Sequence, residues 1–140
     1  MITMNKAARY MLFAAAALLL AALVLEALPV GAVIVFAPGP DSRVARTFSF
    51  FSLIPPGYAD FFPLLSGVCT VMAALLTTLL LIRRRARGIS ALVFCCAAAI
   101  FSLLPALVFG TSHMNAASWV IFALLIASCA LQAVAVARGK

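Results

Sequence analysis

Glu26 is the residue in this sequence best suited to chemistry, because it is the one acid inside a long apolar run. An ionised carboxylate within a bilayer costs at least about 2.5 to 3.5 kcal/mol on insertion scales, so such an acid is neutral, paired or facing a wet cavity. Pro29 follows within one turn and removes a backbone donor from the helix. We expect either a proton- or cation-coupling site here or, as the simpler interpretation, an interfacial acid bonded to backbone donors or to loop groups such as Arg43, Arg46 and Tyr58.

The other reactive residue types have no partners at useful spacings. No Cys-x-x-Cys motif joins the cysteines, which lie inside apolar runs and are interpreted as small packing residues: Cys69, Cys95, Cys96 and Cys129. One histidine, His113, and three acids are too few for a metal site. No Gly-x-Ser-x-Gly element accompanies the serines. We therefore expect no catalytic residues, no metal, no cofactor and no enzymatic activity.

The composition indicates that a bilayer rather than water surrounds most of the chain. Of its 140 residues, 67% are hydrophobic and 9% are charged, and the mean hydropathy is +1.25, far from the values of globular domains. A helix of about 20 apolar residues crosses a hydrocarbon core of about 30 Å. Four continuous runs of this kind favour helices over a barrel, whose strands would alternate. We expect an all-α bundle of four transmembrane helices, one domain over residues 1–140, with helices at about 10–36, 61–82, 89–109 and 115–137.

Basic residues flank these runs and predict the orientation of the bundle. Eight of the ten lie in three clusters that contain no acid: Lys6 and Arg9; Arg83, Arg84, Arg85 and Arg87; Arg138 and Lys140. Short loops rich in Lys and Arg stay cytoplasmic, so both termini should be inside a bacterial plasma (inner) membrane and the loop at 37–60 outside. The clusters should also attract anionic lipid headgroups. Nucleic acid is not expected, since no basic stripe carries readout residues.

The outer loop at 37–60 combines helix breakers with aromatic residues. Prolines and glycines at 38–40 and 55–57 enclose a segment in which Val44, Phe48 and Phe51 fall on one side of a helical projection. We expect a short amphipathic helix there. Its aromatic residues would form a headgroup anchor, a lid over the helix ends, or a binding surface for a partner or a lipid: Phe48, Phe50, Phe51 and Tyr58.

Small and weakly polar residues recur every four positions along the second run, at Ser66, Thr70, Ala74 and Thr78. Such a stripe lets membrane helices approach closely and form hydrogen bonds across the contact. Packing within the bundle is the default interpretation, and packing against a second copy of the chain is the alternative.

The first run also admits a second interpretation, as a cleaved signal peptide. Its basic start and apolar core are followed by Val30, Gly31 and Ala32, which resemble a small-residue cleavage site. The apolar residues that continue to Phe36 favour a retained helix instead.

In its size, its helix count and the glutamate of its first helix, the chain resembles the small four-helix multidrug transporters. That resemblance implies a proton- or cation-coupling role for Glu26. The chain departs from the family in its long outer loop, in the outward position of Glu26 and in a charge bias that specifies one orientation. The leading interpretation is therefore a non-enzymatic accessory or interaction component, with a homo-oligomer or another membrane protein as partner. The alternative is a small oligomeric transporter or channel subunit that uses Glu26.

Overall fold

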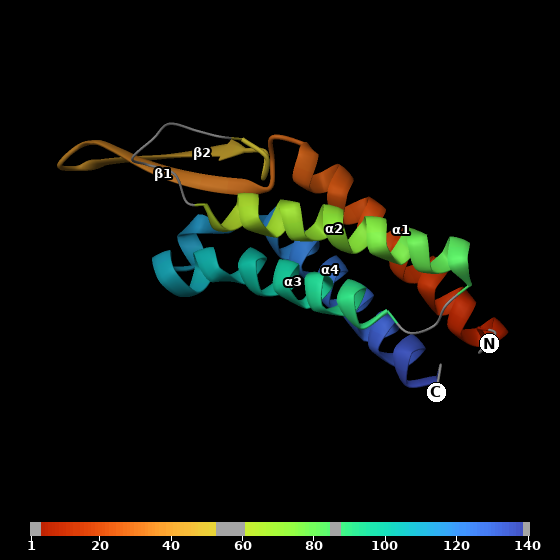
Figure 1. Cartoon of the computed structure of the whole chain (residues 1–140). Helices are drawn as coiled ribbons and strands as arrows, with labels where there is room; N and C mark the ends of the chain where they lie inside the picture. Colours follow the sequence, from red (N-terminus) through yellow and green to blue (C-terminus); the bar gives the residue numbers. More distant parts are fainter. Residues whose placement is uncertain (1–3, 53–60, 85–87, 139–140) are drawn as a thin grey trace.

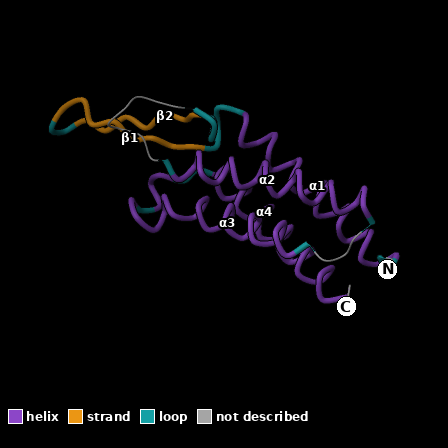
Figure 2. Tube along the Cα trace, in the orientation of Figure 1, coloured by secondary structure: helices purple, strands orange, loops and turns teal. Residues whose placement is uncertain are grey.

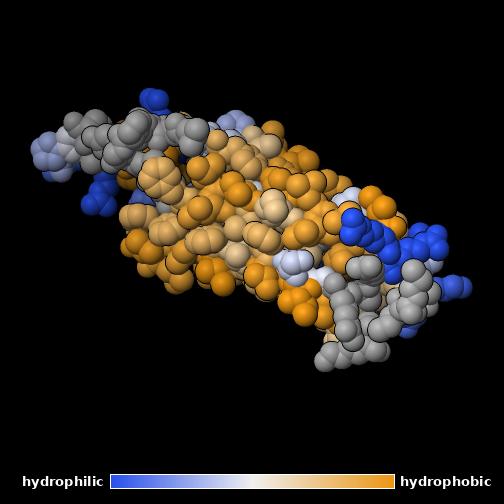
Figure 3. Space-filling view, in the orientation of Figure 1, coloured by the Kyte–Doolittle hydropathy of each residue, from blue (hydrophilic) through white to orange (hydrophobic). Residues whose placement is uncertain are grey.

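The computed structural model of the chain contains four long helices, with a two-stranded hairpin between the first and the second (Figure 1). The helices are α1 (Lys6–Ala27), α2 (Phe62–Arg83), α3 (Ile89–Phe109) and α4 (Ala116–Arg138). The structure describes residues 4–52, 61–84 and 88–138. All four helices are long and apolar enough to cross a membrane, which points to a multi-pass membrane protein. Figure 3 shows the matching surface, an apolar belt with hydrophilic residues at both ends.

The helices form a ring in which each packs on the next in sequence and α1 closes against α4. Both ends of the chain, the end of α2 and the start of α3 lie at one end of the bundle, called here the terminal end (Figures 1 and 2). The hairpin and the 3-10 helix η1 (Thr111–His113) lie at the other, the hairpin end. The clustered basic residues that the structure describes belong to the terminal end: Lys6, Arg9, Arg83, Arg84 and Arg138.

Three of the helices lie within one residue of the ranges expected from the sequence, but α1 differs. It begins after Asn5, whose side chain accepts a hydrogen bond from the amide of Ala7 over 3.4 Å. It ends at Ala27 rather than at 36, because a residue that precedes a proline disfavours the helical conformation. Leu28, before Pro29, is extended with φ −72° and ψ 146°.

The segment between α1 and α2 contains a β-hairpin, so the amphipathic helix expected there is wrong. Strand β1 (Ala32–Gly39) pairs antiparallel with β2 (Ser42–Phe48), and Ala32 lies opposite Phe48. The apolar stretch that opens β1 is rich in β-branched residues, which favour strands. Val44 and Phe48, four residues apart, share one side of a helix and also one face of a strand, since four fits both periods. The expected helix rested on that ambiguous spacing.

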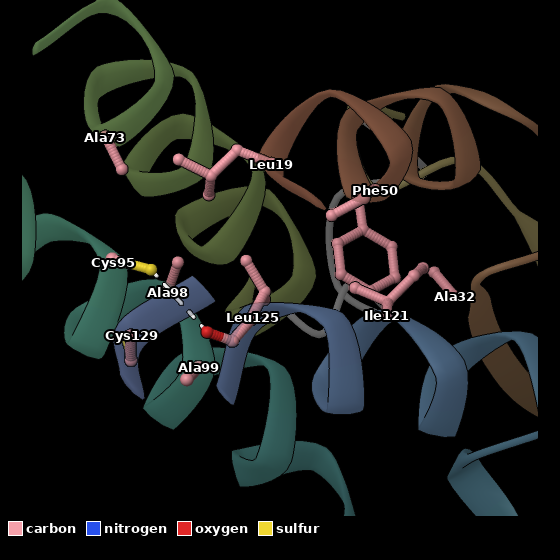
Figure 4. Close-up of a cluster of buried hydrophobic side chains, with 11 residues drawn as sticks. Leu19, Ala32, Phe50, Ala73, Cys95, Ala98, Ala99, Ile121, Leu125 and Cys129 are labelled. Atoms are coloured by element: carbon pink, nitrogen blue, oxygen red, sulfur yellow. Dashed lines mark hydrogen bonds between the residues drawn. The ribbon is translucent and has the colours of Figure 1, made fainter. Parts of the chain in front are cut away.

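The core of the bundle is built from small residues and a few large ones. Cys95, Ala98 and Ala99 of α3 face Leu125 of α4, with Leu19 of α1 above them (Figure 4). Small side chains at such contacts allow close approach of membrane helices, where packing rather than exclusion of water holds them together.

The base of the hairpin completes this core toward the hairpin end. Ala32 and Phe50 are buried in it beside Ile121 of α4, as Figure 4 shows. Gly31 is needed at this point, because a Cβ there would lie 2.9 Å from both Ile121 Cδ1 and Phe50 Cε1. The hairpin base therefore fills the space beyond the end of α1.

Candidate functional site

Glu26 lies in the last turn of α1 and is fully buried. The hydroxyl of Thr70 donates to its Oε1 over 3.0 Å, and its Oε2 has no hydrogen-bond partner among the described residues. Thr70 stands eight residues after Phe62, the first residue of α2, which places this contact about 12 Å inside the hairpin end. The carboxyl of Glu26 therefore lies in the interior of the bundle, bonded to a side chain of α2.

The Thr70 hydroxyl has a second acceptor within reach. Its oxygen lies 2.9 Å from the backbone carbonyl oxygen of Ser66, one turn earlier in α2. The Ser66 hydroxyl is engaged elsewhere, because it donates to the carbonyl of Ala98 in α3 over 2.8 Å. A hydroxyl carries one hydrogen, so Thr70 serves either Glu26 or Ser66 at a given moment. We call Glu26, Thr70 and Ser66 the Glu26 site.

The chain that follows β2 covers the Glu26 site at the hairpin end of the bundle. The carbonyl of Glu26 accepts hydrogen bonds from the Ser49 hydroxyl and from the Phe50 amide, each over 2.9 Å. The Phe50 side chain is 3% exposed and packs in the core. The chain after β2 is thus hydrogen-bonded directly to the backbone of Glu26.

The other end of the hairpin is tied to the start of α4. The Asn115 side-chain amide donates to the carbonyl of Val30 over 2.6 Å, and the Ser118 hydroxyl donates to the carbonyl of Gly31. Asn115 Oδ1 also accepts from the Ser118 amide over 2.9 Å, as an N-cap residue does. Hydrogen bonds therefore hold both ends of the hairpin against the helices, where the hairpin base covers the Glu26 site.

The two loop arginines expected near Glu26 lie elsewhere. Arg43 and Arg46 are exposed on β2, and no basic side chain among the described residues bonds to the carboxyl. Of the aromatic candidates, Phe48 is half-buried at the hairpin base, Phe50 is buried and Phe51 is exposed. Tyr58 lies outside the described residues.

The small-residue stripe of α2 follows a course slightly different from the expected one. Ser66 and Thr70 are buried, but Ala74 is half-buried and Thr78 is exposed. The next buried positions are Ala73 and Thr77. A step of four residues turns about 40° past a full turn of an α-helix, so three such steps leave the buried face.

A second buried polar cluster, which sequence reasoning missed, lies nearer the terminal end. Gln132 of α4 is 1% exposed and donates through Nε2 to the hydroxyl oxygens of Thr77, over 3.3 Å, and Ser128, over 3.4 Å. We call these three residues the Gln132 layer. Its signal in the sequence was the single glutamine of the chain, placed inside an apolar run. Buried apolar residues stand between the layer and the Glu26 site along the helices. Ala73 of α2 lies between Thr70 and Thr77, and Leu19 and Ala22 of α1 lie between Glu26 and Ala15, whose carbonyl accepts from Ser128.

The cysteines take part in packing. Cys95 is buried and its thiol lies 3.6 Å from the carbonyl oxygen of Leu125, a weak bond between α3 and α4 that Figure 4 draws. All four cysteines are free thiols. Among the described residues no group of three or more His, Cys, Asp and Glu side chains could hold a metal ion.

Comparison with known proteins assigns the chain no function. No protein-family model matches it, and no curated protein or solved structure is significantly similar to it. The residues around Glu26 are therefore the basis for a functional assignment.

Proposed function

We propose that the chain is a non-enzymatic, proton-coupled membrane protein in which Glu26 takes up and releases the proton. The observation that carries this proposal is the position of the Thr70 hydroxyl between two acceptors, Glu26 Oε1 at 3.0 Å and the carbonyl oxygen of Ser66 at 2.9 Å. That geometry accommodates both forms of the carboxyl without movement of the helices.

The two forms differ by the carboxyl proton and by the direction in which the Thr70 hydroxyl points its hydrogen. When Glu26 is ionised, the Thr70 hydroxyl donates to Oε1. When Glu26 carries a proton on Oε1, that proton is donated to Thr70 Oγ1, and Thr70 turns its own hydrogen to the Ser66 carbonyl. A hydroxyl accepts and donates at once, so both arrangements keep every hydrogen of the Glu26 site paired. A buried carboxyl with only one donor is otherwise expensive to ionise within a bilayer.

Exchange of this proton requires a path to water, and both Glu26 and Thr70 are fully buried among the described residues. Phe50 closes the side of the hairpin, while Leu19, Ala22 and Ala73 close the side of the Gln132 layer. We expect the hairpin base to move when the proton is exchanged, because Ser49 and Phe50 are bonded to the Glu26 carbonyl. An acid closed off in this way suits a transporter or channel subunit that opens to one side at a time.

The orientation we propose has the terminal end in the cytoplasm of a bacterial plasma membrane. Its basis is the set of basic residues at that end, including Lys6, Arg9 and Arg83, because Lys and Arg are enriched in cytoplasmic loops. Anionic headgroups of the inner leaflet would contact the same residues. The hairpin and the cover of the Glu26 site then face outward.

Proton flux into proteoliposomes tests the proposal. Purified protein is reconstituted with a pH-sensitive dye inside, and flux is driven by a potassium diffusion potential. Glu26→Gln keeps the shape of the side chain but cannot be ionised, so we expect flux to fall at least tenfold. Asp41→Asn, at an exposed acid of the hairpin turn, is the matched control and should leave flux unchanged. Equal flux in the wild type and Glu26→Gln would refute the proposal, as would no flux in the wild type.

A second candidate function is an accessory role in which the hairpin binds another protein. The observation that favours it is the exposure of β2, in which only Phe48 is partly buried. The hairpin also extends beyond the ends of the helices (Figure 1). A photo-crosslinking residue at Thr47 should then capture one defined partner or a second copy in native membranes. Labelling that gives no crosslinked product would remove this candidate. The same residue placed at Leu107, on the exposed surface of α3, is the control.

A further inference from the structure

In the Gln132 layer, one polar atom, Gln132 Oε1, has no hydrogen-bond partner among the described residues, and we call the place of this atom the open position. The hydroxyl of Thr77 donates to the carbonyl of Ala73 over 2.7 Å, and the hydroxyl of Ser128 donates to the carbonyl of Ala15 over 3.2 Å. Each hydroxyl has therefore used its hydrogen and can only accept from Gln132. The two N–H groups of the Gln132 amide fill both acceptors. Gln132 Oε1 is left buried and without a partner among the described residues.

The open position persists if the Gln132 amide is turned over. In that orientation the oxygen would face Thr77 and Ser128, whose hydroxyls would rotate to donate to it. The NH₂ group would then occupy the open position and would need acceptors. Only a group that both donates and accepts satisfies either orientation, and water is the smallest such molecule. Buried waters in proteins occur where otherwise unsatisfied polar groups are found.

The Gln132 layer and the Glu26 site are related through α2. Thr70 and Thr77 are seven residues apart, which puts them on nearly the same face and about 10 Å apart along the helix. Thr77 lies six residues before Arg83, and Gln132 six residues before Arg138, so the layer is about 9 Å from the terminal end. A polar group thus stands between Glu26 and the basic end of the bundle.

We propose that the Gln132 layer binds a water molecule and, resting on the function proposed for Glu26, that this water receives the proton on its way between Glu26 and the terminal end. The proton moves from Glu26 Oε1 to a water that enters past Leu19, and then to the water held at Gln132. Gln132 is neither donor nor acceptor of the proton. It is a positioning residue that keeps a water at this depth.

Water-edited solid-state NMR of the labelled protein in lipid bilayers tests the water site directly. The side-chain amide of Gln132 should receive magnetisation from water at short mixing times, whereas the methyl groups of the buried Leu125 should not. Thr77→Val removes one hydroxyl of the layer and should shift the Gln132 amide signal. Thr78→Val is the matched control, since the exposed Thr78 makes the same bond to its own helix, at 2.8 Å, without contacting the layer. A Gln132 amide with no contact to water would overturn the site.

The proteoliposome assay tests the relay separately. Gln132→Met keeps the length of the side chain and removes its hydrogen bonds, so we expect proton flux to fall at least fivefold. The infrared band of protonated Glu26, identified by its loss in Glu26→Gln, should remain. Normal flux in Gln132→Met would overturn the relay and leave the Glu26 proposal intact. Equal flux in the wild type and Glu26→Gln would instead refute the proposed function and with it the relay, while the NMR result would still decide the water site.

Discussion

The hydroxyl oxygen of Thr70 lies 3.0 Å from Oε1 of Glu26 and joins the middle of α2 to the last turn of α1. The partner residues are 44 positions apart in the sequence, and both are fully buried. Because this is the one hydrogen bond of the Glu26 carboxyl among the described residues, the bond bears on stability as well as on proton exchange.

Thr70→Val should destabilise the protein by about 1 to 3 kcal/mol, the cost of leaving a buried polar group without its partner. The change keeps the volume of the side chain, so the loss reports the hydrogen bond and not a cavity. Thermal unfolding in detergent measures it. Thr78→Val, at the exposed position of the same helix, should stay within about 0.5 kcal/mol of the wild type. Equal effects at the two positions would contradict the assigned role of Thr70.

Phe50→Ala should lower the free energy of unfolding by about 3 to 5 kcal/mol, since it removes a buried aromatic side chain and leaves a cavity. The cavity would adjoin Ala32 and Ile121. Phe51→Ala, at the exposed neighbour, should cost clearly less. Unfolding in detergent compares the two variants. A similar loss in both would show that Phe50 is not the residue that closes this end of the bundle.

Gly31→Ala should destabilise the protein by about 1 to 3 kcal/mol through overpacking. The added Cβ would lie 2.9 Å from Ile121 Cδ1 and from Phe50 Cε1. Ile121→Val removes Cδ1, so the double variant should recover part of the loss. The coupling energy from a double-mutant cycle is the measurement. Strict additivity of the two changes would contradict this packing.

Asn115→Asp should separate the cap of α4, made by the side-chain oxygen of Asn115, from the bond to the hairpin, made by its side-chain N–H. Asp caps a helix about as well as Asn, so α4 should keep its start. The variant loses the N–H that donates to the Val30 carbonyl, and it places a carboxylate against that oxygen. Amide hydrogen exchange in β1 should therefore accelerate while exchange in the first turns of α4 stays the same. Acceleration in α4 as well would mean that the cap and the tie to the hairpin are not separable.

Much of the bundle was predictable because local features determine it. The spans of α2, α3 and α4 are continuous apolar runs bounded by polar or breaking residues, and these properties suffice to place a membrane helix within a residue or so. The end of α1 was also open to prediction, since Pro29 disfavours a helical conformation at Leu28. The apolar stretch from Ala32 onward obscured it, because an apolar run of that length fits a helix or a buried strand equally well.

The amino-acid sequence by itself therefore determined four apolar helices and one acid, Glu26, inside the first of them. It also determined that the basic residues cluster at the two termini and between the second and third helices. The tertiary structure decided how that acid is held. The burial of Glu26 beside Thr70, the hairpin that covers it and the pairing of Gln132 with Thr77 all join residues far apart in the chain. The spacing of residues within one helix specifies which face they share, but the partner of that face depends on how the helices pack against one another.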